Sequence, residues 1–464
     1  MNLGFIESKT YDEISVGDIA GTEHVLTTND AMAFASISGF HSVLDSDERI
    51  ERAGGIPPTG PNMWCASLIS GLFSMNIPGP GCTLTNVSLS FHNRIHVGDR
   101  ILVSVQVTAK DDISKSVTFD CVASNGDGTS IFSGTAQVIA PPEKLRWSTI
   151  PVPQLIVNDP YRHYRGLIAR ATSKPAVKTA VVWPCDEVSL GGAMQAFKDK
   201  LIDPILVGSE SKIRSTAQAM QLDLGTIRIV DIAESRAAAI RGVELARKGE
   251  AQMLMKGSLH TDELMGAVVS REGGMRTGRR ISHVFVLDVP SYHKPLFVSD
   301  AAINIQPDLE TKIDILQNAI DMMHKLELTN PKVAILSAVE SVNAAIPSTL
   351  DAAALCKMVD RGQITGAIVD GPLAFDNAIS SDAARIKKIK SQVAGDPDLL
   401  MVPNLEAGNI LFKELQYLAG ALAAGVVVGA KVPIVLTSRA DGELARMASC
   451  ALGVLLAKPA PVLN

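Results

Sequence analysis

Residues 433–446, with the sequence PIVLTSRADGELAR, place three reactive side chains where an apolar strand gives way to a charged helical segment. Ser438 supplies a hydroxyl, Arg439 a permanently charged guanidinium and Asp441 a carboxylate. A guanidinium binds phosphate through parallel hydrogen bonds, and a carboxylate can transfer a proton. Because ligands of α/β proteins bind where strands end, this trio predicts a site for an anionic substrate.

Other polar residues follow apolar runs in the same part of the chain. The loop at 271–280, REGGMRTGRR, carries four arginines among glycines, which suits it to hold an anion by guanidinium groups and backbone amides. Three further candidate segments are KGSLH, SDAAIN and NLEAGN. From these segments we expect the anion ligands to be Lys256, Gly257, His260, Arg276, Thr277, Arg279, Asn304, Gly408 and Asn409.

Several well-defined motifs are missing from the sequence. It has no G-x-x-x-x-G-K-[ST] loop, no G-x-G-x-x-G turn between a strand and a helix, and no G-x-S-x-G elbow. The six cysteines and nine histidines do not cluster at metal-ligand spacing. We therefore expect no metal site and no tightly bound cofactor.

Composition limits the classes of partner. Hydrophobic residues make up 46% of the 464 residues, charged residues make up 20%, and the net charge is −6. A general nucleic-acid or acidic-membrane binder needs a basic face, so we expect neither partner. The first residues lack the pattern of a signal peptide, and we expect a cytoplasmic protein with reduced thiols. The uncharged stretch at 415–430 is too short for a membrane span and is predicted to be a buried helix ending at Gly429.

The pattern of elements changes near residue 140. Before it, alternating β-branched runs and two apolar helical segments predict an α+β domain with a sheet wrapped on a helix. After it, continuous apolar runs alternate with amphipathic helices, which predicts an α/β domain with a mainly parallel sheet in two lobes. Five prolines between residues 141 and 160 indicate a linker. The expected division is 1–140, a linker at 141–163, and 164–464.

The second part resembles the phosphate acetyl/butyryl transferase family. Five segments carry the resemblance, in order over roughly 300 residues: GMRTGRRISHVFVLDVP, LFVSDAAINIQPDLETKIDIL, VDGPLAFDNAIS, LLMVPNLEAGNILFK and VPIVLTSRAD. The segments MRTGR and TSRAD are similar in sequence to the corresponding segments of butyryl-type members. The resemblance implies an isocitrate dehydrogenase-like phosphotransacetylase fold, usually as a dimer. It also implies the reaction acyl-CoA + phosphate = acyl phosphate + CoA, with coenzyme A as a substrate.

The family pattern assigns roles to individual residues. Arg439 would bind phosphate, Ser438 would hydrogen-bond the thiol or oxyanion, and Arg276 with Thr277 would contact phosphate. The catalytic carboxylate of acetyl-type members lies several residues beyond the Ser-Arg pair. Here Asp441 and Glu443 are both nearer, and we favour Asp441. A second family arginine has no match, because the position reads Met265-Gly266.

Simpler structural roles are alternatives for several of these residues. Asp441 and Asn409 are also suited to cap the helices that follow them, and His260 to be an ordinary polar residue satisfied by its neighbours. An arginine at a strand end can equally form a surface ion pair.

The first part resembles MaoC-like hotdog hydratases over about 130 residues, in YDEISVGDIAGTEHVLTTNDAMAFASISG, MWCASLIS, IPGPG and FHNRIHVGDRI. Active members carry G-D-x-N-P-x-H, in which the Asp and His activate water. Here Phe40 replaces the Asp and Asp45 replaces the His. We expect a domain that has lost hydration, because Phe cannot transfer a proton; His41 with Asp45 is the alternative acid–base pair.

The sequence therefore predicts a fusion whose partners are acyl-CoA, phosphate and acyl phosphate, and which forms a homodimer or higher homo-oligomer. Three alternatives stay open at this point. They are a bifunctional enoyl-CoA hydratase/phosphate acyltransferase, a non-catalytic acyl-CoA-binding scaffold, and an acyltransferase that uses acyl carrier protein.

Overall fold

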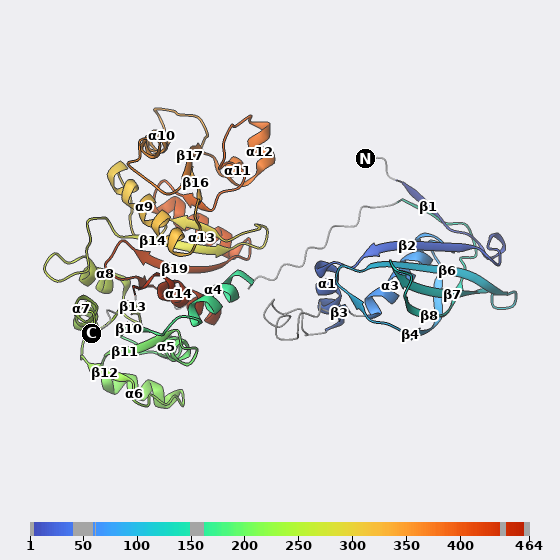
Figure 1. Ribbon diagram of the computed structural model, residues 1–464, viewed down its shortest axis with the longest axis horizontal. Coiled ribbons are helices and arrows are strands. Elements are labelled where there is room, and N and C mark those ends of the chain that lie inside the picture. The colour runs from blue at the N-terminus through green and yellow to red at the C-terminus, as the bar shows by residue number, and fades with distance from the viewer. Residues whose placement is uncertain (1–3, 40–58, 61, 149–161, 437–441, 459–464) are drawn as a thin grey trace. The chain divides into compact units, whose positions relative to one another are not determined.

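The computed structural model describes residues 4–39, 59–60, 62–148, 162–436 and 442–458. The chain divides into two compact units, Met1–Asn158 and Asp159–Asn464 (Figure 1). Each unit has its own hydrophobic core.

The first unit is built mainly of antiparallel strands. Its elements are β1 (Phe5–Glu7), the 3-10 helix η1 (Tyr11–Glu13), β2 (Ile19–Val25), α1 (Thr28–Ser38), β3 (Thr59–Gly60), α3 (Asn62–Met75), β4 (Thr83–Phe91), β5 (Ile95–His96), β6 (Arg100–Asp111), β7 (Ser116–Asn125), β8 (Ser130–Ile139) and β9 (Arg146–Ser148). Five of these strands form one antiparallel sheet in the order β2-β6-β7-β8-β4.

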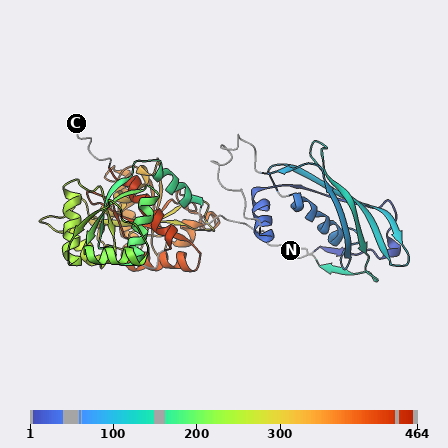
Figure 2. The ribbon, with the colours of Figure 1, turned by 90° about the horizontal axis from the view of Figure 1, so that it is seen from below.

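That sheet packs against helix α3 and buries one of its faces there (Figure 2). Alternate residues of β6 are buried because successive side chains of a strand point to opposite faces. Trp64, Ile69 and Phe73 of α3 enter the same core. The predicted α+β arrangement of a sheet around a helix is confirmed. Gly98 and Gly128, at φ +100° and +83°, lie in the turns that precede β6 and β8.

A short strand lies within the proline-rich stretch. Residues 146–148 form β9, which pairs antiparallel with β1 in the register Phe5–Ser148, Ile6–Trp147 and Glu7–Arg146. The described part of that stretch before residue 149 is therefore tied to the first unit.

The second unit alternates strands and helices. Its elements are α4 (Arg162–Thr172), β10 (Val177–Val182), α5 (Glu187–Lys198), β11 (Ile202–Gly208), α6 (Glu210–Ala219), β12 (Arg228–Asp231), α7 (Ser235–Arg247), β13 (Met253–Lys256), α8 (Thr261–Val269), β14 (Ser282–Asp288), β15 (Leu296–Ser299), α9 (Leu309–Lys325), β16 (Lys332–Leu336), α10 (Pro347–Asp360), β17 (Ile368–Leu373), α11 (Phe375–Ile379), α12 (Ser381–Ile386), β18 (Leu399–Met401), α13 (Leu405–Tyr417), β19 (Leu422–Val428), β20 (Ile434–Val435) and α14 (Glu443–Leu456).

The strands of this unit form one 11-stranded sheet in the order β12-β11-β10-β13-β20-β19-β14-β15-β18-β16-β17. Parallel pairs dominate both flanks. The three central pairs, β20–β19, β19–β14 and β14–β15, are antiparallel. The parallel strands of the two flanks therefore run in opposite directions.

Helices cover both faces of this sheet (Figure 2). Val181 and Met255 enter one core with α5, α9 and α14, whereas their neighbours Val182 and Leu254 enter another with α7 and α8. This alternation explains the continuous apolar runs, since both faces of each strand are buried.

The predicted helix at 415–430 is wrong. Helix α13 ends at Tyr417, Gly420 follows at φ +67°, and residues 422–428 form β19. The valines at the end of this run favour a strand, and β19 pairs with β14 over its whole length. Among the described residues, no helix has both the length and the apolar character needed to cross a membrane.

Candidate functional site

The ends of β10, β13 and β20 lie side by side in the second unit. Val182 pairs with Lys256, and Met255 pairs with Val435, all in parallel register. The chain therefore leaves β20 beside Lys256. This is where the loop holding Ser438, Arg439 and Asp441 begins.

The loop after β13 approaches the loop after β10 very closely. The Gly257 N–H donates to the Val182 carbonyl over 2.8 Å, and the Ser258 N–H donates to the Trp183 carbonyl over 2.9 Å. A Cβ on Gly257 would come within 2.4 Å of the Trp183 carbonyl oxygen. Only glycine fits this position, so the contact fixes the path of the chain beside Lys256.

Two predicted ligands flank this glycine. The Lys256 ammonium donates to the Gly257 carbonyl over 3.2 Å. His260 is exposed and precedes helix α8 as its N-cap residue, and its backbone N–H donates to Glu263 over 3.2 Å. The His260 backbone therefore helps to start helix α8. The imidazole of His260 remains a proposed ligand of the anionic substrate.

Ser438, Arg439 and Asp441 lie outside the described residues, between Leu436 and Gly442. The N-cap residue of the following helix α14 is Gly442. The alternative that Asp441 caps this helix concerns a residue outside the described part of the chain. Glu443, the other candidate carboxylate, is exposed at the first position of α14.

The sequence did not single out Arg446, a further cation in the first turns of α14. Its side chain packs against α5, with Nε 3.5 Å from where a Cβ of Gly192 would lie. Helix α5 starts after β10 and α14 starts after β20, so both begin near the end of β13. The sequence could have indicated Arg446 by its position, because it follows Ser438, Arg439 and Asp441 closely and lies at the start of the next helix.

A second group of predicted ligands surrounds the turn after β15. The buried Asp300 carboxylate accepts hydrogen bonds from the backbone N–H groups of Ala302, Ile303 and Asn304, over 3.0 to 3.1 Å. The Asn304 amide donates to Asp300 and to the Ile281 carbonyl. Burial raises the pKa of Asp300 although these donors oppose the shift.

Two other predicted ligands pack on this turn from helix α13. A Cβ on Gly408 would lie 2.9 Å from the Ala301 side chain, and the Asn409 amide donates to the Ala301 carbonyl over 3.3 Å. Asn404, not Asn409, is the N-cap of α13. These contacts give both residues a structural role in holding α13 against the turn.

The arginine-rich loop lies at the turn between β19 and β20. Arg276 forms a bridge with Ala430, and the Thr277 hydroxyl donates to the Gly429 carbonyl over 2.7 Å. Arg279 forms an ion pair with Asp321 of helix α9. Thr277 and Arg279 line a cavity of about 700 Å³.

The structure separates two of these three groups of predicted ligands, the one at the end of β13 and the one in the arginine-rich loop. Leu254 pairs with Ile434, and Ile434 pairs with Val427, which gives one row across β13, β20 and β19. Lys256 lies beyond this row at the end of β13, whereas Ala430 lies beyond it on the opposite side, after β19. The 437–441 loop starts at the same end of these strands as Lys256, Gly257 and His260. The opposite end holds Arg276, Thr277 and Arg279.

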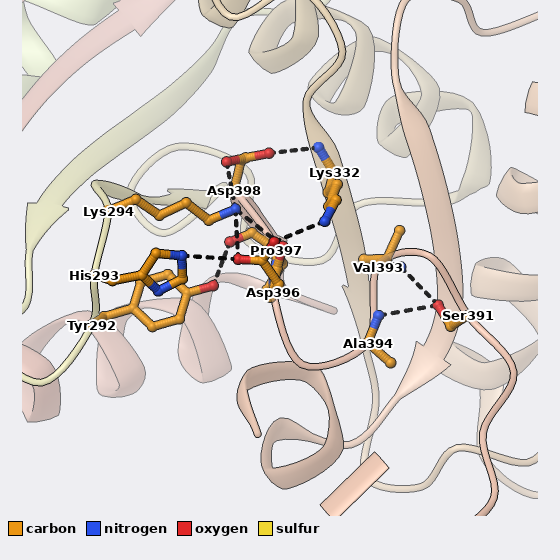
Figure 3. Close-up of polar contacts among 10 residues, drawn as sticks. All are labelled: Tyr292, His293, Lys294, Lys332, Ser391, Val393, Ala394, Asp396, Pro397 and Asp398. Carbon is orange, nitrogen blue, oxygen red and sulfur yellow. Dashed lines mark hydrogen bonds and ion pairs between the residues drawn. The ribbon is translucent and has the colours of Figure 1, made fainter. Parts of the chain in front are cut away.

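A cluster of ionisable residues at the β14–β15 turn is a structural ion network (Figure 3). Lys294 pairs with Asp396 and Asp398 over 2.9 and 2.8 Å, and Lys332 pairs with Asp396 over 2.7 Å. Burial would raise the pKa of Asp396, but Lys332 and Lys294 outweigh it and lower this pKa. The network ties together the starts of β15, β16 and β18.

No group of three or more His, Cys, Asp or Glu side chains suited to a metal ion occurs within the described ranges. The six cysteines are free thiols, and burial raises the pKa of Cys185, which lies near the end of β10.

Comparison with known proteins identifies the class of the second unit. Residues 234–453 match the family model described as phosphate acetyl/butaryl transferase. Phosphate acetyltransferase of Rhizobium meliloti is 59% identical over 294 residues, which cover 63% of this chain and 93% of that protein. Phosphate butyryltransferase of Clostridium acetobutylicum is 42% identical over 296 residues, covering 64% and 98%.

Among solved structures, a branched-chain phosphotransacylase from Enterococcus faecalis V583 matches with a TM-score of 0.53 and 30% identity, covering 60% of this chain and 98% of that one. The chain belongs to the phosphate acetyl/butyryl transferase family. Identity to the acetyltransferase exceeds identity to the butyryltransferase in the two relatives given above, so the expected closeness to butyryl-type members is not supported by them.

Proposed function

We propose that this protein transfers an acetyl or other short acyl group between coenzyme A and inorganic phosphate. Acyl-CoA and phosphate give acyl phosphate and CoA, and the reverse reaction uses the same site. The observation that carries the proposal is the parallel pairing of Met255 with Val435, which starts the Ser-Arg-Ala-Asp loop beside Lys256 and Gly257.

In the direction of acyl-CoA formation, a carboxylate takes the proton of the CoA thiol. A free thiol has a pKa of about 8.5, so a base increases the thiolate fraction at neutral pH. We assign this base to Asp441, with Glu443 as the alternative. The thiolate sulfur forms a bond to the acyl carbon, the bond between that carbon and the phosphate oxygen breaks, and phosphate leaves.

The charge that builds on phosphate needs fixed cations. Arg439 provides a planar guanidinium for the phosphate oxygens, and Lys256 adds a positive charge from the neighbouring strand. Ser438 donates a hydrogen bond to the carbonyl oxygen or the thiol. Gly257 allows the loop after β13 to lie against the loop after β10, which fixes the chain beside Lys256. Coenzyme A is a substrate here, and we propose no tightly bound cofactor.

The activity is tested by following free CoA thiol with acetyl, propionyl or butyryl phosphate as the acyl donor. The proposal predicts loss of thiol with at least one donor. Absence of turnover with all three would contradict it. A requirement for acyl carrier protein in place of CoA would identify a different acyltransferase.

For the first unit we propose a hotdog domain without hydratase activity. Phe40 and Asp45, which replace the acid and base of the hydratase pattern, lie outside the described residues. Within the described part, the pair His24–Asp30 has its carboxylate engaged at the start of α1, where it accepts from the Thr27 N–H over 2.9 Å. We expect no loss of crotonyl-CoA absorbance with the whole chain, and hydration that disappears in His41→Ala would support the bifunctional alternative.

We further propose that the protein acts in the cytoplasm as a homodimer or a higher homo-oligomer. Its partners are then acyl-CoA, phosphate and acyl phosphate, with no role for nucleic acid or a membrane.

A further inference from the structure

A cavity of about 700 Å³ lies at the turn between β19 and β20, in the second unit. Four elements form its wall: the arginine-rich loop, helix α9, the β19–β20 turn and the end of helix α14. The charged residues that line it are Arg279, Lys325, Lys431, Lys458 and Asp321. Four cations therefore face one carboxylate.

The single carboxylate is already engaged. Asp321 pairs with Arg279 over 2.5 Å, and it also accepts from the Gln317 amide over 2.9 Å. Three lysines remain whose charge this pair does not balance. The pKa of Lys325 is lowered, mainly by desolvation of its ammonium and to a lesser degree by the nearby charge of Lys458. The Asp321 carboxylate acts in the opposite direction and raises this pKa. An anion between these lysines would relieve their mutual repulsion.

The remainder of the wall is apolar. The apolar side chains that line it are Met322, Val428, Val432, Pro433 and Leu456. A cavity of this volume is far larger than a phosphate ion and lies in the range of sites for small organic ligands. Its ligand should therefore combine several negative charges with an apolar or flat part.

The cavity is distinct from the proposed acyl-transfer site. Helix α14 begins at Glu443, directly after the Ser-Arg-Ala-Asp loop, and its last residue, Leu456, lines the cavity. A helix of 14 residues is about 20 Å long. Lys256 and the cavity also lie on opposite sides of the row formed by Leu254, Ile434 and Val427.

We propose that this cavity is a second, non-catalytic binding site for a nucleoside di- or triphosphate. The lysines Lys325, Lys431 and Lys458 pair with its phosphates, and Met322, Val432 and Leu456 contact its base. Lys431 and Lys458 are exposed, so they also draw a polyanion toward the mouth of the cavity, and binding weakens as salt is added.

The test is isothermal titration of the whole protein with metal-free ATP while CoA is held at saturation. One ATP should bind per chain. The double variant Lys431→Gln/Lys458→Gln should bind ATP at least tenfold more weakly, because it removes two of the phosphate-binding charges. The matched control is Lys198→Gln, an exposed lysine of α5 away from the cavity, which should leave affinity unchanged.

The same variants are assayed for acyl transfer, and kcat and the KM for CoA should stay within about twofold of the unmodified protein. Absence of ATP binding would overturn the proposal. So would a raised KM for CoA in the double variant, since it would make the cavity part of the acyl-transfer site. Inorganic pyrophosphate binding as tightly as ATP would also overturn it, because the apolar wall would then contribute nothing. If melting shows the double variant to be unfolded, the two single variants give the same comparison.

Discussion

Gly257 and Trp183 are in direct backbone contact, and a Cβ on Gly257 would lie 2.4 Å from the Trp183 carbonyl oxygen. The change Gly257→Ala must therefore push the loop after β13 away from the loop after β10. We expect a loss of about 1–3 kcal/mol in the free energy of unfolding, as for other overpacked sites, and a large drop in kcat/KM for acyl transfer. Urea unfolding and the thiol assay measure the two effects.

Gly266→Ala is the control for this change, because nothing lies within 4 Å of a Cβ there. Gly266 is inside helix α8, so alanine should stabilise the helix slightly and leave activity intact. Equal activity in the two glycine variants would show that the loop after β13 has no part in the reaction.

Lys256→Gln should raise the KM for acyl phosphate by roughly tenfold, since one phosphate-facing charge is worth about 1–2 kcal/mol. The parallel pairing of Val182 with Lys256 places this lysine where strands end beside the start of the 437–441 loop. Steady-state kinetics with varied acyl phosphate measure the effect, and Lys198→Gln serves as the control. An unchanged KM would remove Lys256 from the site.

Asp300→Ala should destabilise the second unit by about 3 kcal/mol, because three backbone N–H groups and the Asn304 amide lose a buried acceptor. Asp223→Ala is the matched control, since its exposed carboxylate accepts one backbone hydrogen bond, from Gly225. Thermal unfolding of the two variants gives the comparison. A loss no larger in Asp300→Ala than in the control would contradict the structural role given to this turn.

The ion network at the β14–β15 turn predicts a pH dependence of stability (Figure 3). The pKa of Asp396 is lowered from 3.8 in the folded protein, so the unfolded chain binds its proton first as pH falls. The stabilisation is present above this pH and is lost as pH falls through the folded value. The free energies of unfolding in urea of Asp396→Asn and of the unmodified protein should differ most at about pH 6 and least at about pH 3. A difference that grows toward acid would contradict this assignment.

The apolar runs predicted most of the second unit correctly. The continuous apolar runs correctly predicted strands of one sheet that are covered by helices on both faces. β19 was missed because its first half, Leu-Ala-Ala-Gly, lacks β-branched residues and continues the apolar pattern of helix α13. The three valines that follow favour a strand, and the pairing with β14 fixes it.

The candidate ligands were harder to group from sequence. Strand ends predict where ligands bind only when the strands run in the same direction, and the sequence does not reveal direction. The antiparallel centre of the sheet, formed by β20, β19, β14 and β15, puts Lys256 and Arg276 apart. Hydrogen bonds of Asn304 and Asn409 to backbone carbonyls likewise depend on contacts between distant segments.

In the proposed reaction, the guanidinium of Arg439 holds the phosphate while the CoA sulfur attacks the acyl carbon. The most direct test is the kcat for acyl-CoA formation by Arg439→Ala, in a variant whose melting temperature is shown to be unchanged. We expect a loss of at least about 100-fold, as when a single charge-stabilising donor is removed from an active site. Acyl transfer at the rate of the unmodified protein would contradict it.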